Sequence, residues 1–347
     1  MAGEGGVSGA LRRAALRRAS VASERRAIDR LASEPRMRTP IAGAPTSASD
    51  ATGRAYSTLP DPRLRALSAR YAANAGIDYA PPPVWAKVIP GDARAYAGAY
   101  DAMRDDLTDP LVQASWKKMG EETLDQLQAL VDDGYKFEFI PPGRGDPYAT
   151  SPRLALEDLR DNKHMFVFPT EAGYGTLNAA DERSPLLAPV RGFSKDAFGG
   201  APFVVNDAFR AVHDSLGHAP MGAGFRAGGE ENAFRHHAAL YSDLARPAVA
   251  AETRGQNSWV NYGPHGAENR RASAADTIYA DQKAGIMPDF VYNRGLEWLG
   301  RPVSTEELRR MIAKGGVTGA LAAMLLGGEA MVDNERGVVR IALPEHA

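Results

Sequence analysis

Residues 109–134 read DPLVQASWKKMGEETLDQLQALVDDG and predict the clearest helix of the chain. Pro110 suits the first helical position, because the N–H that it lacks would have no partner there. Apolar side chains recur at helical spacing from Trp116 to Val131, and Gly134 can adopt the left-handed conformation that ends a helix. We therefore expect a fold built around this helix.

The flanking stretches predict short strands and further helices. Residues 135–140 and 165–168 have the alternating or continuous apolar pattern of short strands. Helices are expected at residues 151–161, from Asn206 or Asp207 onward, and at residues 230–244, 275–284 and 304–313, the last opened by Ser304 and Glu307 as a capping box. The regular strand and helix alternation of a doubly wound sheet is missing. We predict an α+β fold, a mostly helical single catalytic domain with a few short strands, over residues 61–347.

Residues 1–60 differ in composition from the rest of the chain. They hold 10 arginines, no lysine and 5 acidic residues, whereas the remainder holds 31 basic and 38 acidic residues. Residues 39–60 are rich in Pro, Ser, Thr, Ala and Gly, as flexible linkers are. So few large apolar side chains cannot offset the entropy of ordering, which predicts a disordered basic arm and linker. Such an arm could contact nucleic acid, serve as a targeting peptide or be a plain tail.

The composition also excludes several classes of site. The chain has no cysteine, so disulfides, thiolate zinc sites, iron–sulfur clusters and cysteine nucleophiles are excluded. No apolar run approaches the roughly 20 residues that a membrane helix needs. We expect a cytoplasmic protein without membrane contact that acts on a small-molecule substrate, and any metal must be bound by nitrogen and oxygen.

The run HDSLGHAP at residues 213–220 contains the candidate metal ligands of the chain. It supplies His213 and His218, and Glu252 follows 34 residues after the second histidine. Two imidazoles and one carboxylate occupy one side of a six-coordinate ion and leave the other side open, as in non-haem Fe(II) oxygenases. We predict that these three residues bind Fe(II) as a facial triad, while Asp214 and Arg254 shape the pocket. The forked donors of Arg254 suit a substrate carboxylate or phosphate.

The spacing of the two histidines is unusual for a helical metal site. Residues five apart are separated by about 140° around an ideal α-helix, so their rings diverge. Gly217 and Pro220 flank His218 and are residues that loosen and stop helices. We therefore expect the second histidine to lie at or past the end of a helix, where both rings can reach one ion.

The segment 213–221 resembles the metal-binding segment of the aromatic amino acid hydroxylases. In that family His-Glu-x-x-Gly-His-x-Pro precedes a glutamate ligand at a comparable interval, and the likeness covers residues 205–260. The resemblance implies an iron-dependent monooxygenase with tetrahydropterin as cosubstrate, with His213, His218 and Glu252 as ligands. Asp214 stands where the family has an acidic residue near the pterin. The residues leave open whether a pterin, a 2-oxo acid or neither supplies electrons.

Two other functions remain open. Residues 229–264 resemble an uncharacterised domain of phage and mobile-element proteins, which would make the chain a virion-associated or accessory module with structural histidines. A metal-dependent phosphohydrolase would instead add His164 and Asp243 to the His213–Asp214 pair, with zinc or manganese as its metal.

Several polar residues around the motif could serve as further ligands or as support. Glu231, His236 and His237 lie on the helix after the motif, and we expect these two histidines at the surface or behind the ligands. Metal-bound histidines usually donate their second N–H to an orienting partner, and the candidates are Gln256, Asn257 and Asp207.

Overall fold

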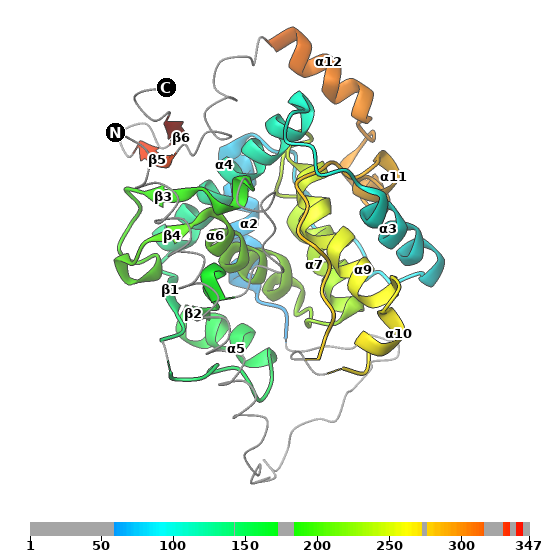
Figure 1. The fold of residues 1–347 in the computed structure, drawn as a ribbon. Coiled ribbons are helices and arrows are strands. Elements are labelled where there is room, and N and C mark those ends of the chain that lie inside the picture. Colours follow the sequence, from blue (N-terminus) through cyan, green and yellow to red (C-terminus); the bar gives the residue numbers. More distant parts are fainter. Residues whose placement is uncertain are drawn as a thin grey trace, which may run out of the picture.

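The structure is a computed structural model that describes residues 59–141, 143–172, 184–272, 276–315, 329–333 and 338–342. The predicted basic arm therefore lies outside the described residues, apart from Leu59 and Pro60 at its end. The described chain is mostly helical with a few short strands, as expected for an α+β fold (Figure 1). Within these residues, no helix is both long and apolar enough to span a membrane.

The main helices follow one another along the chain with short 3-10 turns and strands between them. Their bounds are α2 (Pro62–Ala75), α3 (Pro90–Ala102), α4 (Pro110–Asp132), α5 (Arg153–Asn162), α6 (Val205–Val212), α7 (Ala227–Ala238), α8 (Arg246–Ala250), α9 (Gln256–Tyr262), α10 (Gly266–Asn269), α11 (Asp289–Tyr292) and α12 (Thr305–Gly315). Two π-helical segments, η5 (His213–His218) and η7 (Ala251–Gly255), continue α6 and α8.

Helix α4 confirms the prediction for residues 109–134. The Asp109 carboxylate accepts a hydrogen bond from the Leu111 N–H at 2.8 Å, and Pro110 is the first helical residue. Gly134 follows the helix with a φ of 87°, which only glycine adopts at low cost. The helix buries Trp116 and Leu127 and packs against α6 and α8, which places it behind the candidate site.

The strands form two small sheets among the described residues. Strand β1 (Lys136–Phe139) pairs in parallel with β2 (His164–Val167), and α5 is the crossover between them. The second sheet has the order β4-β3-β5-β6, from β3 (Pro189–Arg191), β4 (Phe203–Val204), β5 (Glu329–Asp333) and β6 (Val338–Ala342). Both sheets lie on the same side of the helices in Figure 1, away from α3 and α9.

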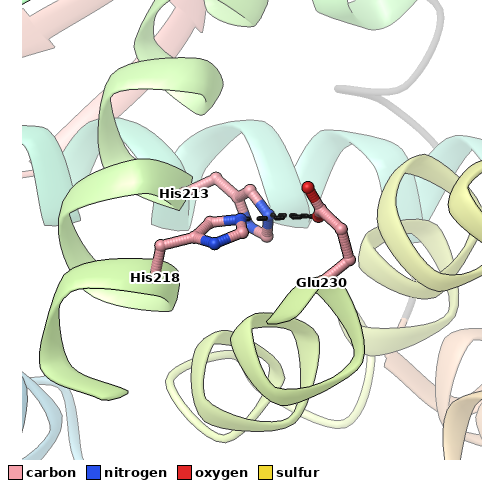
Figure 2. A group of neighbouring side chains, drawn as sticks. All are labelled: His213, His218 and Glu230. Carbon is pink, nitrogen blue, oxygen red and sulfur yellow. Dashed lines mark ion pairs between the residues drawn. The ribbon is translucent and has the colours of Figure 1, made fainter. Parts of the chain in front are cut away.

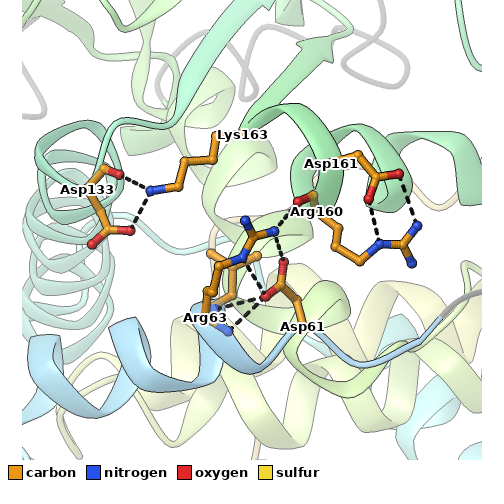
Figure 3. Close-up of polar contacts among 7 residues, drawn as sticks. Asp61, Arg63, Asp133, Arg160, Asp161 and Lys163 are labelled. Carbon is orange, nitrogen blue, oxygen red and sulfur yellow. Dashed lines mark hydrogen bonds and ion pairs between the residues drawn. The ribbon is translucent and has the colours of Figure 1, made fainter.

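Ion pairs and caps attach α2 and α5 to this frame (Figure 3). The Asp61 carboxylate caps α2 by accepting from the N–H of Arg63 at 2.8 Å, and the Arg63 guanidinium donates to the carbonyl of Arg160 at the end of α5. Lys163 ends α5 in the left-handed conformation, and its Nζ lies 3.2 Å from the Asp133 carboxylate. These contacts fix the β1–α5–β2 unit against α2 and α4.

Three helix predictions differ from the structure: two helices have other bounds, and one predicted helix is not formed. The helix before the motif begins at Val205 rather than at a cap on Asn206 or Asp207, because Asp207 lies inside its first turn and accepts from the Val204 N–H at 2.9 Å. Helix α7 spans residues 227–238 rather than 230–244. The predicted helix at 275–284 is wrong for residues 276–284, which have no regular structure.

Two of the remaining helix predictions are confirmed. Helix α5 lies within one or two residues of the predicted range. At α12, Ser304 and Glu307 form the expected capping box, in which the Ser304 N–H donates to the Glu307 carboxylate at 3.0 Å and the Glu307 N–H donates to the Ser304 hydroxyl at 3.2 Å.

Candidate metal centre

A π-helix brings His213 and His218 together. Residues 213–218 form the π-helical segment η5. In a π-helix the backbone hydrogen bonds join residues five apart, so two such residues lie on the same side of the helix. The two ring centroids are 4.9 Å apart. The rings therefore converge through the π-helical turn, and His218 is the last residue of that segment, so the expectation that it lies at the end of a helix is confirmed. Gly217 and Pro220 do not stop the helical path directly after His218, as the sequence suggested, because residues 219–221 continue it as a 3-10 turn.

Glu230 is the carboxylate that faces the two rings (Figure 2). Its Oε2 lies 3.4 Å from Nε2 of His218 and 3.7 Å from Nε2 of His213. One ligand atom from each of these three residues lies within 4.8 Å of the others, and this is the one such group found among the described residues. His218 is fully buried, whereas Glu230 is 19% exposed. The set could hold one metal ion whose open side meets solvent near Glu230.

Close packing between two helices places Glu230, which stands in the first turn of α7. A Cβ on Gly217 would lie 3.3 Å from the Ala233 carbonyl oxygen, so this glycine lets η5 approach α7. A Cβ on Gly229 would lie 1.6 Å from the carbonyl oxygen of Gly224, so only glycine fits directly before Glu230. Backbone contact thus sets the distance between the carboxylate and the histidines.

Hydrogen bonds orient the His218 ring with Nε2 toward Glu230. Nδ1 lies 3.1 Å from the carbonyl oxygen of Ala223, so Nδ1 carries the proton and donates it. In the neutral ring Nε2 is then a lone pair, and this buried atom makes no hydrogen bond although Oε2 of Glu230 lies 3.4 Å away. The Phe225 ring stacks on the imidazole at 4.4 Å. A buried nitrogen lone pair without a donor is what a metal ligand requires.

The His213 ring is oriented by a second buried histidine. Its Nδ1 lies 3.0 Å from Nδ1 of His237, and Nε2 of His237 lies 3.1 Å from Oε1 of Gln126. Because the amide oxygen only accepts, His237 carries its proton on Nε2 and accepts at Nδ1 from His213. Burial lowers the pKa of His237 well below its ordinary value, which keeps this ring neutral. In the neutral His213 ring the proton is therefore on Nδ1, and Nε2 is the nitrogen on the side of Glu230.

The electrostatics of the group match this arrangement. Burial alone would raise the pKa of the Glu230 carboxyl, but the charge of His218 and the hydrogen-bonding contact with His213 hold it well below its ordinary value. Burial opposes a charge on His218, yet the Glu230 carboxylate raises the pKa of that ring. Without a metal the two residues form an ion pair, and a cation would take the place of the ring proton.

Glu252, the predicted third ligand, is outside the group whose ligand atoms lie within 4.8 Å of one another. It belongs to η7. Its carboxylate accepts from Gln256 Nε2 at 2.7 Å. Burial raises the pKa of Glu252 to about 8, against the opposing charge of Arg210. Without a bound cation, burial thus disfavours the ionised form of Glu252 that metal binding requires.

Arg254 and Asp214, the predicted pocket residues, differ in position. Arg254 is buried, its Nε donates to the Glu231 carboxylate at 2.9 Å, and its Nη1 donates to the carbonyls of Val291 and Arg294. Glu231 therefore pairs with Arg254. Asp214 lies on η5, where burial raises its pKa against the charges of both motif histidines.

The remaining candidates on this part of the chain have other partners. His236 is fully buried, with Nδ1 2.6 Å from the Leu216 carbonyl oxygen, so the prediction of a surface position is wrong. His237 does lie behind a ligand, as expected. His164 lies 2.7 Å from Asp158, and Asp243 pairs with Arg246, so neither belongs to the group around Glu230.

The predicted orienting residues also bond elsewhere. Gln256 donates to Glu252 and to Gln282, and Asp207 accepts from Thr170. The backbone carbonyl of Ala223 and the ring of His237 orient the histidines instead.

A cavity of about 230 Å³ opens beside Glu230, and neither of the two candidate histidine ligands lines it. Glu230 lines it, together with residues of α3, α7, α9 and the loops at 86–89 and 294–297. Arg254 is among the lining residues and Asp214 is not. The carboxylate thus belongs both to the candidate metal group and to the wall of a space that can hold a small molecule.

Sequence reasoning missed Glu230, although one signal pointed to it. It follows the pair Gly228-Gly229 and stands 12 residues after His218, at the start of the next helix. Glu252 was predicted because two imidazoles and one carboxylate suit a facial site, and the resembling family has its glutamate ligand at a comparable interval. Comparison with known proteins adds no constraint, since no family model, curated protein or solved structure matches the chain.

Proposed function

We propose that this chain is a mononuclear non-haem Fe(II) oxygenase of the hydroxylase type, with His213, His218 and Glu230 as the metal ligands. The observation that carries the proposal is the convergence of two imidazole Nε2 atoms and one carboxylate oxygen within 4.8 Å. Two nitrogens and one oxygen on one side of an ion are the donor set of the facial triad, which leaves the remaining positions open.

Further features of the centre support a bound metal. In the neutral ring Nε2 of His218 is a buried nitrogen without a hydrogen-bond partner, and burying such an atom is costly unless a metal ion, or a proton that pairs with Glu230, lies beside it. The Ala223 carbonyl and His237 fix the protons of both rings on the side away from Glu230. Such supporting hydrogen bonds are typical of metal-bound histidines.

The proposed substrate is a small molecule that enters the cavity beside Glu230. A bound iron would supply the oxidising chemistry, with O₂ as the oxidant. The protein would hold the substrate at the cavity wall and exclude water from the buried side, where His218 is fully shielded from solvent. Burial raises the pKa of the Asp214 carboxyl, and the charges of both motif histidines act on this carboxyl and oppose that rise. We assign Asp214 the role of adjusting the electrostatic potential at the metal centre.

The proposal is tested by anaerobic reconstitution of the full chain with Fe(II). Nitric oxide binds iron that has an open position next to its protein ligands, and the adduct has a diagnostic electron paramagnetic resonance signal. We expect this signal in the wild-type protein and not in His213→Ala. Oxygen uptake should then be measured with tetrahydropterin, with a 2-oxo acid and with neither, to identify the electron donor.

Two outcomes would replace the proposal. Tight zinc or manganese binding together with phosphatase activity would indicate a hydrolase. Absence of metal binding, together with DNA binding that is lost on deleting residues 1–60 and kept in His213→Ala, would indicate an accessory module with structural histidines.

A further inference from the structure

Arg235 is a buried cation without a carboxylate partner in the wall of the cavity beside Glu230. The residue is 7% exposed, its Nε donates to the Gly295 carbonyl at 2.8 Å, and its Nη1 donates to the Val84 carbonyl at 3.4 Å. Among the described residues it forms no ion pair within 4.0 Å. Carbonyl dipoles and the Trp298 ring, 4.9 Å away, only partly compensate a buried charge.

The other cations of the cavity are neutralised or solvated. Arg254 pairs with Glu231, and Arg294 lies 3.0 Å from Asp92. Lys87 is exposed to solvent. Arg235 is therefore the buried lining cation without a carboxylate in direct contact, although the charges of Glu231 and Glu297 act on it from farther away.

The net charge of the cavity favours an anionic ligand once a metal is bound. Its lining includes the cations Lys87, Arg235, Arg254 and Arg294 and the acids Asp92, Glu230, Glu231 and Glu297. These charges cancel. A divalent ion on Glu230 and two neutral histidines would leave an excess of positive charge, which an anion close to Arg235 would balance.

We propose that the cavity binds a small carboxylic acid and that Arg235 holds its carboxylate. The forked N–H groups of a guanidinium match the two oxygens of a carboxylate. A single negative charge suits this position better than a phosphate dianion, because the charges of Glu231 and Glu297 also act on Arg235. Tyr96 and Tyr262 line the same cavity and offer apolar surface to the body of the molecule.

The role of the carboxylic acid as the substrate of the iron centre rests on the proposed function, whereas the binding of a carboxylate in the cavity does not. The bound carboxylate would anchor the molecule at Arg235, while Glu230 belongs to both the cavity and the metal ligands. Carboxylate binding itself does not need the metal and can be measured without it.

The test is a fluorine NMR titration of the full chain, metal-free and zinc-loaded, with para-fluorobenzoate and with its neutral analogue para-fluorobenzamide. We expect the benzoate to bind at least about tenfold more tightly than the amide, as a hydrogen-bonded charge pair provides. Metal-free protein should retain this preference. A failure of iron binding with the preference intact would overturn the proposed function and leave the carboxylate site standing.

Matched variants locate the anion. Arg235→Gln should reduce the affinity for para-fluorobenzoate about tenfold, and Arg235→Lys should retain part of it. The double variant Asp92→Asn/Arg294→Gln is the control. It removes a cation of the same cavity together with the carboxylate that neutralises it, so the net charge stays the same and the affinity should change little. Circular dichroism confirms that each variant is folded.

If Arg235→Gln does not fold, competition in the wild-type protein decides the question. Acetate should displace para-fluorobenzoate, and acetamide should not. Equal affinity for benzoate and benzamide, a folded Arg235→Gln that keeps the preference, or displacement by inorganic phosphate at lower concentration than by acetate would overturn the proposal.

Discussion

Nδ1 of His213 lies 3.0 Å from Nδ1 of His237, on the side of the His213 ring that faces away from Glu230. This contact fixes the His213 proton and leaves its Nε2 free for a metal. Replacing His237 by leucine removes the acceptor, so the ring loses its orientation. We expect His237→Leu to weaken metal affinity by about 10- to 100-fold, as loss of such supporting partners typically does. Isothermal titration with Zn²⁺ or Fe(II) measures the change.

His236 provides the control for that substitution. It is the neighbouring residue, is equally buried, and bonds to Tyr79 and to the Leu216 carbonyl rather than to a ligand. His236→Gln should lower thermal stability and leave metal affinity within about threefold of wild type. Equal losses of affinity in both variants would contradict a specific role for His237.

The adjacent glycines 228 and 229 give a sharp steric test. A Cβ on Gly229 would lie 1.6 Å from the Gly224 carbonyl oxygen, so Gly229→Ala must displace the start of α7 and with it Glu230. A Cβ on Gly228 would meet nothing within 4 Å, and alanine there should favour the helix by up to about 1 kcal/mol. We expect a lower melting temperature and weaker metal binding in the first variant alone, both measurable by thermal denaturation and metal titration.

Glu252 should make the stability of the metal-free protein depend on pH. The pKa of Glu252 is raised from 4.5 to about 8 in the folded state. At pH values between these two, the folded protein therefore keeps a proton on Glu252 that the unfolded chain has lost. The stabilising contribution is complete below the unfolded pKa and is lost as the pH rises through about 8.

Glu252→Gln mimics the protonated carboxyl and should remove this dependence. The free energy of unfolding of the variant, relative to wild type, should rise as the pH increases from 5 to 9 in urea denaturation. A constant difference across that range would show that Glu252 is ionised in the folded protein.

Much of the fold follows from local patterns in the sequence. Helix α4 was predictable because Asp109, Pro110 and Gly134 mark its ends and apolar spacing marks its buried face. The strands β1 and β2 and the capping box at Ser304 followed in the same way. The parallel pairing of β1 with β2, and the positions of β3 and β4, depend on contacts between distant segments that no local pattern encodes.

The candidate site was predictable in its histidines and not in its carboxylate. His213 and His218 stand in one short motif, yet their convergence requires a π-helix, which a count of 3.6 residues per turn does not anticipate. Glu230 joins them because Gly217 and Gly229 allow backbones to touch. Such contact depends on tertiary packing, so spacing along the chain favoured Glu252 instead.

The most direct test is the metal stoichiometry of the full chain and two matched variants, measured by inductively coupled plasma mass spectrometry after reconstitution with Fe(II) and removal of free metal. We predict close to one iron per chain in the wild type and in Glu252→Ala, and a loss of iron in Glu230→Ala. Retention of iron in Glu230→Ala together with its loss in Glu252→Ala would contradict the assignment of Glu230 as the carboxylate ligand. Absence of iron from all three proteins would contradict the metal centre itself.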